Sequence, residues 1–350
     1  MSIANIPVIN FDAERNDEVI KELYEIKSNL PKELRCKDYI LENGQIWTSW
    51  TVRESVYRKK YASFPTMARG LFTQVTNDDQ QYIVARGYDK FFNILETGFT
   101  QWPALFKDTE GPYEITAKEN GCIIFIAALT PAEVVVTSKH AIPAVKTDPT
   151  AHGGVGYNWL LRHLSLVGKT EKDLAEWLYD KRITLIAELC DDEFEQHILP
   201  YTGKDRGLYL HGINYNTHDL NTLPASTVQQ VAIDFGFHTI DYHLFDNISQ
   251  VKEFGENMQQ IGLYKEREVE GVVVRFTNAM LESKDGDVRI IEPKKTLKLN
   301  YEKTQYYIEW LRKRVVSNPD WFKNYKAQKG IIFVRQEFEK FWNEGKISEE

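Results

Sequence analysis

The chain is poor in cysteine and contains no long apolar segment. Its 350 residues include three cysteines, Cys36, Cys122 and Cys190, whose spacing matches no common metal motif. So few cysteines favour a reducing compartment, and Cys122 and Cys190 are interpreted as core residues because they lie in apolar runs. No apolar run approaches about 18 residues, and no basic stretch precedes an apolar one at the N-terminus. We therefore expect no membrane span and no signal peptide, and a location in the cytoplasm or the nucleus.

The charge of the chain is negative overall but unevenly distributed. The formal net charge of −8 argues against a general nucleic-acid binder, which needs Lys and Arg for the phosphate backbone. Between residues 293 and 335, however, eleven basic residues face only three acidic ones. A second basic group at 53–60 is interleaved with aromatic residues. Such interleaving suits a ligand with phosphates and bases, although solvated helix faces give the same pattern.

The hydrophobic pattern predicts short strands interrupted irregularly by helices. Continuous apolar or β-branched runs predict strands at Tyr82–Arg86, Tyr113–Ala117, Cys122–Leu129, Glu133–Ser138, Thr184–Leu189, Leu208–Asn214 and Gly271–Phe276. Helices are predicted at Tyr157–Val167, from the Thr170 cap to about Lys181, at Pro224–Phe235 and at Ile248–Gln260. This order favours an α+β fold with mainly antiparallel sheets. After Leu299 the pattern becomes helical (Glu302–Val315, Pro319–Ala327, Val334–Asn343), which predicts domains of 1–299 and 300–350.

A lysine stands on a tight corner between two of the predicted strands. The tetrapeptide Lys118-Glu119-Asn120-Gly121 separates Tyr113–Ala117 from Cys122–Leu129. A lysine amine can attack a phosphoanhydride once neighbouring cations and partial desolvation favour its neutral form. Gly121 would let phosphate approach the backbone closely, because glycine has no Cβ. The tetrapeptide alone is weak evidence, so its context decides.

Other charged or aromatic residues lie within predicted strands or close to their ends, where a charge needs a partner. They are Arg69, Lys90, Phe92, Lys139, Glu188, Glu270 and Lys298. Each could be structural when taken alone. Lys298 lies in 296–300 (TLKLN), and the other residues belong to a set of seven stretches: 68–73 (ARGLFT), 86–93 (RGYDKFFN), 117–126 (AKENGCIIFI), 137–140 (TSKH), 187–201 (AELCDDEFEQHILPY), 207–214 (GLYLHGIN) and 269–275 (VEGVVVR).

In this order the seven stretches resemble the ATP-dependent RNA ligases, which are covalent nucleotidyltransferases. The resemblance is closest to the ligase module of fungal tRNA ligases and more distant to phage RNA ligase 1. It implies a nucleotidyltransferase domain followed by a small helical domain, with Mg²⁺ (or Mn²⁺) as cofactor. It also implies a reaction through a lysine–AMP intermediate, which joins an RNA 5′-phosphate to a 3′-OH.

The resemblance assigns roles to the matched residues. Lys118 would be the nucleophile, assisted by Lys298. ATP would be bound by Arg69, Lys90, Phe92, Lys139, Glu188 and Glu270, with Phe92 stacking on adenine and Glu188 accepting from ribose hydroxyls. Glu270 would also bind the metal. His197 and Arg312 are candidates for an RNA 2′-phosphate beside the 3′-OH. Core packing of Phe92, an ion pair at Glu188 and a structural role of His197 remain open.

The sequence departs from the fungal pattern in two places. Asn300 stands where those relatives have a second lysine, which implies either slower adenylylation or compensation by Lys295 or Lys303. Arg312 and Arg314 do not match the spacing of their arginine pair. The leading interpretation is therefore a ligase that seals tRNA exon halves. The alternatives are a general RNA repair ligase without a 2′-phosphate requirement, and a weakened relative that only binds RNA ends.

The resemblance also bears on partners. The sequence ends at Glu350 without the kinase and cyclic phosphodiesterase modules that fungal tRNA ligases carry. We therefore expect the end-healing activities to come from another polypeptide or from a part that this sequence does not include. We also expect tRNA halves as the RNA substrate, no membrane partner and a monomeric protein.

Overall fold

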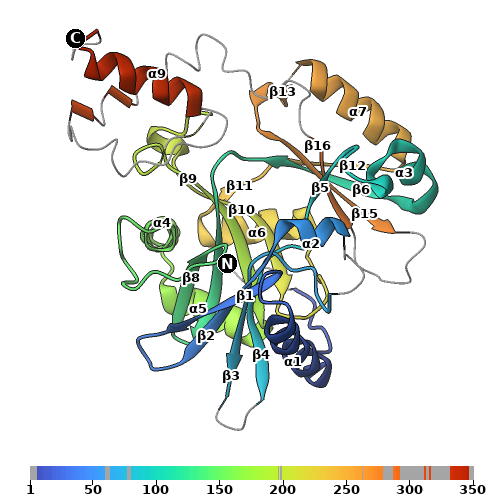
Figure 1. Ribbon diagram of the computed structural model, residues 1–350, viewed down its shortest axis with the longest axis vertical. Helices are drawn as coiled ribbons and strands as arrows, with labels where there is room; N and C mark the ends of the chain where they lie inside the picture. Colours follow the sequence, from blue (N-terminus) through green and yellow to red (C-terminus); the bar gives the residue numbers. More distant parts are fainter. Residues whose placement is uncertain are drawn as a thin grey trace.

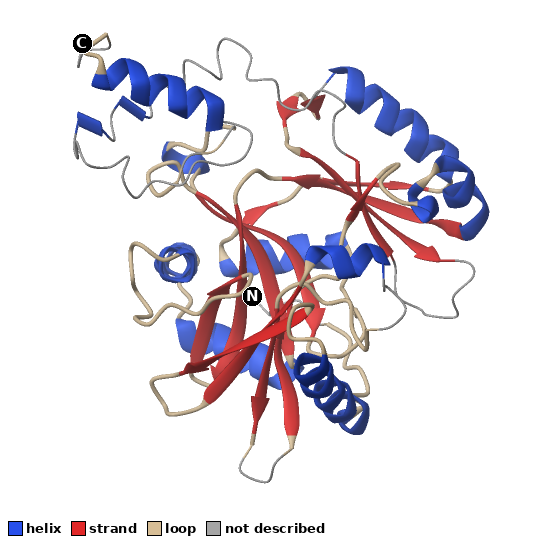
Figure 2. Ribbon diagram, in the orientation of Figure 1, coloured by secondary structure: helices blue, strands red, loops and turns tan. Residues whose placement is uncertain are grey.

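Three larger sheets and their covering helices make up most of the structure, a computed structural model (Figures 1 and 2). It describes residues 6–59, 64–76, 80–195, 197, 199–261, 263–278, 287–291, 311–312, 315–316 and 332–346. Within these residues, no helix is both long enough and apolar enough to cross a membrane.

The first sheet is wholly antiparallel and is covered by the N-terminal helix. Its strands lie in the order β1 (Leu34–Ile40), β2 (Ile46–Val52), β3 (Leu71–Val75) and β4 (Gln81–Arg86). Helix α1 (Ala13–Asn29) begins at Asp12, whose side chain accepts a hydrogen bond from the Arg15 amide at 2.9 Å. Apolar residues of α1 pack against Leu34, Trp50 and Leu71 of the sheet.

The central sheet is buried on both faces. Its order is β11 (His238–Thr239), β10 (Gly207–Tyr215), β9 (Ile183–Cys190), β7 (Cys122–Thr130) and β8 (Glu133–Ser138). One face packs on α4 (His152–Leu166), α5 (Glu171–Lys181) and α6 (Ala225–Phe235). The other packs on the first sheet, where Phe125 and Ile186 meet Trp47 and Phe72. A strand buried on both faces is apolar throughout, which explains the continuous runs in β7 and β9.

The third sheet has its own helices and core. Its order is β12 (Tyr242–Phe245), β6 (Thr109–Lys118), β15 (Gly271–Asn278), β16 (Asp287–Ile291) and β5 (Phe92–Asn93). Apolar residues of α3 (Trp102–Asp108) and α7 (Ile248–Ile261) pack on β6 and β15. Figure 1 shows this layer apart from the first two sheets. The smaller elements are α2 (Glu54–Lys59), η2 (Gly98–Thr100), η3 (Gly203–Asp205), β13 (Leu263–Tyr264) and β14 (Arg267–Glu268).

The predicted α+β class with mainly antiparallel sheets is confirmed. The seven predicted strands correspond to β4, β6, β7, β8, β9, β10 and β15, and only the β10–β11 and β16–β5 pairs are parallel among the described strands. The Thr170 cap of α5 is also confirmed. Its side chain accepts from the Asp173 amide, and Asp173 accepts in turn from the Thr170 amide.

Helix α4 begins five residues before its predicted start. The predicted helix began at Tyr157, whereas the observed helix includes Gly153, Gly154 and Gly156, residues of low helix propensity. In the structure these glycines allow close packing. A Cβ on Gly153 would lie 2.7 Å from the Val136 carbonyl oxygen, and one on Gly154 would lie 2.1 Å from that of Asp148. Tertiary packing therefore outweighs propensity at this helix start.

The C-terminal region is described only in part. Helix α9 (Ile332–Asn343) corresponds to the predicted helix Val334–Asn343, and residues 311–312 and 315–316 are also helical. The predicted helix at 319–327 and the residues around the proposed boundary at 300 lie outside the described residues. The division into two domains therefore stays a prediction.

A buried arginine joins the end of β4 to the loop after β10. The Arg86 side chain is fully buried. Its guanidinium donates to the carbonyl oxygens of Thr217 (2.7 Å), Gly87 (2.9 Å) and His218 (3.1 Å), and to the Asp89 carboxylate at 2.7 Å. One side chain thus satisfies three buried carbonyl groups.

Replacing this arginine should destabilise the fold. Arg86→Met would remove the donor to the Thr217 carbonyl oxygen and the ion pair with Asp89, whereas the Gly87 and His218 carbonyl oxygens would keep donors from Asn214 and Thr66. We therefore expect the free energy of unfolding to fall by about 3 kcal/mol in urea titrations. Arg15→Met is the matched control, because Arg15 pairs with Glu18 and Glu22 at the surface, and the expected loss is within about 0.5 kcal/mol. Equal small losses in both variants would contradict the role assigned to Arg86.

Candidate active site

Lys118 lies where the chain passes from one sheet to another. It is the last residue of β6 in the third sheet, and β7 of the central sheet begins at Cys122. The Lys118 carbonyl oxygen accepts from the Glu270 amide at 3.1 Å, and Cys122 lies opposite Leu189 in the β7–β9 ladder. We call residues 118–121 the lysine corner. Both of its ends are held by sheet hydrogen bonds, so it bridges two layers of the fold.

The lysine corner borders a cavity of about 410 Å³. Four basic and two acidic residues are among those that line it: Arg69, Lys90, Lys118, Arg275, Glu119 and Glu188. Two other cavities, of about 450 and 610 Å³, lie elsewhere among the described residues. Volume therefore does not select the site. The gathering of basic residues around a lysine does, because it suits a ligand that carries phosphates.

The Lys118 amine forms an ion pair with the Glu270 carboxylate. Both side chains are about one quarter exposed, at 25% and 26%. The same oxygen of Glu270 accepts from the Asn120 side-chain amide at 3.3 Å. The structure therefore brings the predicted nucleophile and the predicted metal ligand together at the corner.

Glu188 lies in β9 and contacts the corner at Gly121, the end away from Lys118. One of its carboxylate oxygens accepts from the Gly121 amide at 3.2 Å, and the other lies 3.6 Å from Nε2 of His211. Gly121 packs so tightly here that a Cβ would lie 2.3 Å from the Leu189 carbonyl oxygen. Glu188 thus lines the cavity and also supports the corner.

Three further predicted cations lie near one another. Arg69 and Lys90 line the cavity, and Arg69 also pairs with Glu54. Burial, and then the charges of Arg69 and Lys90, lower the pKa of the Lys139 amine to about 8. Arg69, Lys90 and Lys139 therefore lie near one another, although Lys139 is not among the residues that line the cavity, and their predicted role in ATP binding stays a prediction.

The placement of Phe92 does not fit stacking on a nucleotide. Its side chain is fully buried and packs edge-on against Phe99, at 5.0 Å between ring centres. The preceding residue, Phe91, is partly exposed and lines the cavity. Phe92 therefore corresponds to the core-packing alternative, and Phe91 is the aromatic residue at the cavity.

His197 is also buried, with 1% of its side chain exposed. Its Nδ1 lies 2.7 Å from an Asp192 carboxylate oxygen. This placement agrees with the structural alternative for His197. Arg312 lies in a helical segment and is partly buried, whereas Lys298 and Asn300 lie outside the described residues. The roles of Arg312 and Lys298 stay predictions.

The sequence analysis missed a buried wall of the cavity. Arg275 of β15 donates to the Tyr88 hydroxyl at 2.7 Å and to the Glu114 carboxylate at 2.9 Å. Tyr88 stacks on His211, with 5.6 Å between ring centres. The available signal was the single arginine that ends the run of valines in Gly271–Phe276, since a charge in a buried strand needs partners.

The mixed fold with antiparallel sheets is that of a nucleotidyltransferase, and comparison with known proteins identifies the family. A model of the RNA ligase family matches residues 67–344, and the chain belongs to this family. It is similar to tRNA ligase 1 of Schizosaccharomyces pombe, with 39% identity over 331 residues that cover 83% of this chain and 42% of that protein. For the tRNA ligase of Candida albicans the identity is 35% over 372 residues, covering 93% of this chain and 44% of that protein.

The chain thus spans less than half the length of these curated relatives. Among solved structures, two forms of an archaeal ATP-dependent RNA ligase align over most of the chain. Form 1 covers 95% of this chain and 83% of its own, with a TM-score of 0.54 and 12% identity. Form 2 covers 93% and 73%, with a TM-score of 0.51 and 14% identity. At these identities the likeness concerns the fold.

The close contact at Gly121 can be tested by adding one methyl group. In Gly121→Ala the new Cβ would overlap the Leu189 carbonyl oxygen, so we expect unfolding in urea to become easier by about 2 kcal/mol. Gly98→Ala is the control, because a Cβ there meets no atom within 4 Å. A loss at Gly98 as large as that at Gly121 would argue against the described packing.

Proposed function

We propose that the chain is an ATP-dependent RNA ligase module that acts through a lysine–AMP intermediate at Lys118. The observation that carries this proposal is the position of Lys118 at a cavity that also gathers Arg69, Lys90 and Glu188. Membership of the RNA ligase family supports it. The structural likeness to an archaeal ATP-dependent RNA ligase agrees with the fold that this chemistry uses.

In the first step the Lys118 amine would attack the α-phosphorus of ATP. A P–N bond forms, the bond to the β-phosphate oxygen breaks, and pyrophosphate leaves with its electron pair. The ion pair with Glu270 stabilises the charged ammonium form, which has no lone pair for attack. The pair must therefore separate, and the amine must lose a proton, before this step. The AMP would then pass to an RNA 5′-phosphate, and attack by the RNA 3′-OH would release it.

The residues present fit a hard divalent cation such as Mg²⁺ or Mn²⁺. Glu270 and Glu188 offer carboxylate oxygens beside Lys118, and such oxygens are the ligands that these ions prefer. When bound, the cation would neutralise charge that develops on the phosphate oxygens. Glu270 remains our candidate for holding it.

The other cavity residues take roles suited to their groups. Arg69 and Lys90 would contact phosphate, with Lys139 adding positive charge nearby. Glu188 would accept from the ribose hydroxyls. For adenine we propose Phe91 in place of Phe92, because Phe91 has an accessible ring at the cavity.

We propose tRNA exon halves as the RNA substrate, because the two curated relatives are named tRNA ligases. A 3′ end with a 2′-phosphate follows from the same likeness, with Arg312 as its candidate contact. The burial of His197 favours the alternative of a general RNA repair ligase. Equal sealing of RNA with and without the 2′-phosphate would select that alternative. Separate end-healing activities and a monomeric state remain part of the proposal.

Covalent labelling tests the central proposal. Wild-type protein incubated with Mg²⁺ and ATP labelled at the α-phosphate should retain the label through denaturing electrophoresis. Lys118→Ala should lose it completely, because the phosphoramidate needs this amine. Lys107→Ala, which changes an exposed lysine of α3, should label like wild type. Label on Lys118→Ala would refute the assignment, and no label on folded wild type would favour the weakened, RNA-end-binding relative.

The lowered pKa of Lys139 predicts a pH dependence of ATP binding. Lys139 is charged below its pKa of about 8 and neutral above it, so its attraction for phosphate is lost as pH rises. In Lys118→Ala, which cannot react, the dissociation constant for ATP should rise roughly three- to tenfold between pH 7.5 and 9. Adding Lys139→Arg should flatten the profile, since arginine stays charged. An unchanged profile in the double variant would exclude Lys139 as the cause.

A further inference from the structure

Glu119, the residue directly after the proposed nucleophile, carries a carboxylate with no exposed surface. A buried charge is costly unless it is paired and hydrogen-bonded. Here the Arg267 guanidinium contacts both carboxylate oxygens, one of them at 2.8 Å. The Tyr201 hydroxyl donates to the same carboxylate at 2.8 Å. The side chain next to Lys118 is therefore fixed by two residues from outside the lysine corner.

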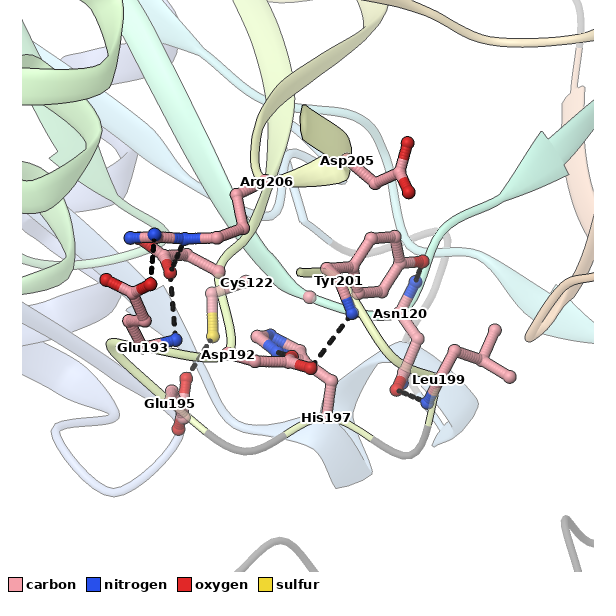
Figure 3. A network of polar contacts seen from close by, with 12 residues as sticks. Asn120, Cys122, Asp192, Glu193, Glu195, His197, Leu199, Tyr201, Asp205 and Arg206 are labelled. Carbon is pink, nitrogen blue, oxygen red and sulfur yellow. Dashed lines mark hydrogen bonds and ion pairs between the residues drawn. The ribbon is translucent and has the colours of Figure 1, made fainter. Parts of the chain in front are cut away.

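The hydroxyl of Tyr201 contacts two successive residues of the corner. Besides donating to Glu119, its oxygen accepts from the Asn120 amide at 2.9 Å. Two residues before Tyr201, the Leu199 amide donates to the Asn120 side-chain oxygen at 3.3 Å. Figure 3 shows Tyr201 and Leu199 on either side of Asn120. The segment that ends at Tyr201 therefore holds the corner through side-chain and backbone groups.

Tyr201 is itself held in place. Its amide donates to one oxygen of Asp192 at 2.9 Å, and the other oxygen of Asp192 lies 2.7 Å from Nδ1 of His197 (Figure 3). Its ring packs edge-on against His197 and Tyr209, and 3% of the residue is exposed. Burial raises the pKa of the Tyr201 hydroxyl above its usual range, so the group stays a donor. Ring packing would persist without the hydroxyl, which hydrogen-bonds two residues of the corner.

We propose that Tyr201 is a positioning residue for Lys118. Its hydroxyl holds Glu119 and Asn120 so that the lysine amine stays at the cavity. The proposal rests on Lys118 being the nucleophile, as proposed above. Reaction rates depend steeply on such placement, because a displacement of about 1 Å can cost a factor of about 100.

Tyr201→Phe removes the hydroxyl and keeps the ring. In single-turnover labelling with ATP, we expect the maximal rate of lysine–AMP formation to fall roughly ten- to a hundredfold. The ATP concentration for half-saturation should change less than about threefold, because Tyr201 is not among the residues that line the cavity. A fall in the maximal rate at nearly constant half-saturation indicates a loss of positioning, because general damage to the site would weaken ATP binding as well.

Tyr209→Phe is the matched control. The Tyr209 hydroxyl donates to the Asp205 carbonyl oxygen at 2.7 Å, and its ring packs against Tyr201. Its loss should leave the labelling rate within about twofold of wild type. Should Tyr201→Phe fail to fold, Asp192→Asn weakens the anchor of Tyr201, and a lower maximal rate at unchanged half-saturation is expected.

A wild-type rate in folded Tyr201→Phe, or an equal loss in Tyr209→Phe, would overturn the positioning role. The positioning role would also be overturned if Tyr201→Phe weakened ATP binding without lowering the maximal labelling rate. If Asp192→Asn has to replace Tyr201→Phe, a wild-type labelling rate in that variant would have the same meaning. Lys118→Ala on the same gel separates the two proposals. If wild-type protein becomes labelled and Lys118→Ala does not, the assignment of Lys118 as the nucleophile is supported, whatever the result with Tyr201→Phe.

Discussion

The buried carboxylate of Glu119 is the constraint on which the candidate site depends. Arg267 and Tyr201 hold it from two different parts of the chain. Because Glu119 cannot leave these partners without exposing or unpairing a charge, the direction of the backbone at Lys118 is fixed. The corner in turn joins β6 to β7, so the spacing of the third and central sheets is set at the same place. The cavity is the space that this arrangement leaves beside the lysine.

Much of the fold could be predicted from the sequence because burial leaves a clear pattern. The strands at 122–130 and 183–190 are apolar throughout, since helices cover one face and the first sheet covers the other. The Thr170 cap could also be predicted, because capping residues form a local sequence pattern. The start of α4 could not be predicted from the sequence, because its glycines pack against the carbonyl groups of Val136 and Asp148, which only the structure shows.

Part of the candidate site was predicted from local sequence patterns, and the part that depends on distant residues was not. Lys118, Arg69, Lys90 and Glu188 border one cavity, as their positions at strand ends and in the matched stretches indicated. Phe92, predicted to stack on adenine, is buried, and the neighbouring Phe91 lines the cavity. Successive side chains of extended backbone point to opposite sides, and the sequence does not say which side faces the ligand. Tyr201 and Arg267 contact Glu119 across 82 and 148 positions of the chain, a separation that no local motif records.

The two sheet ladders also set the number of residues in the lysine corner. Residues 119–121 connect Lys118, the end of β6, to Cys122, the start of β7. Lys118 accepts from the Glu270 amide, and Cys122 lies opposite Leu189. Glu119 and Gly121 are each packed on a fixed partner within this span. Side chains at the corner can vary as long as those partners are satisfied. An inserted or deleted residue cannot be absorbed, because it would shift one of the two ladders out of register. Divergence within this family should therefore preserve the length of the corner.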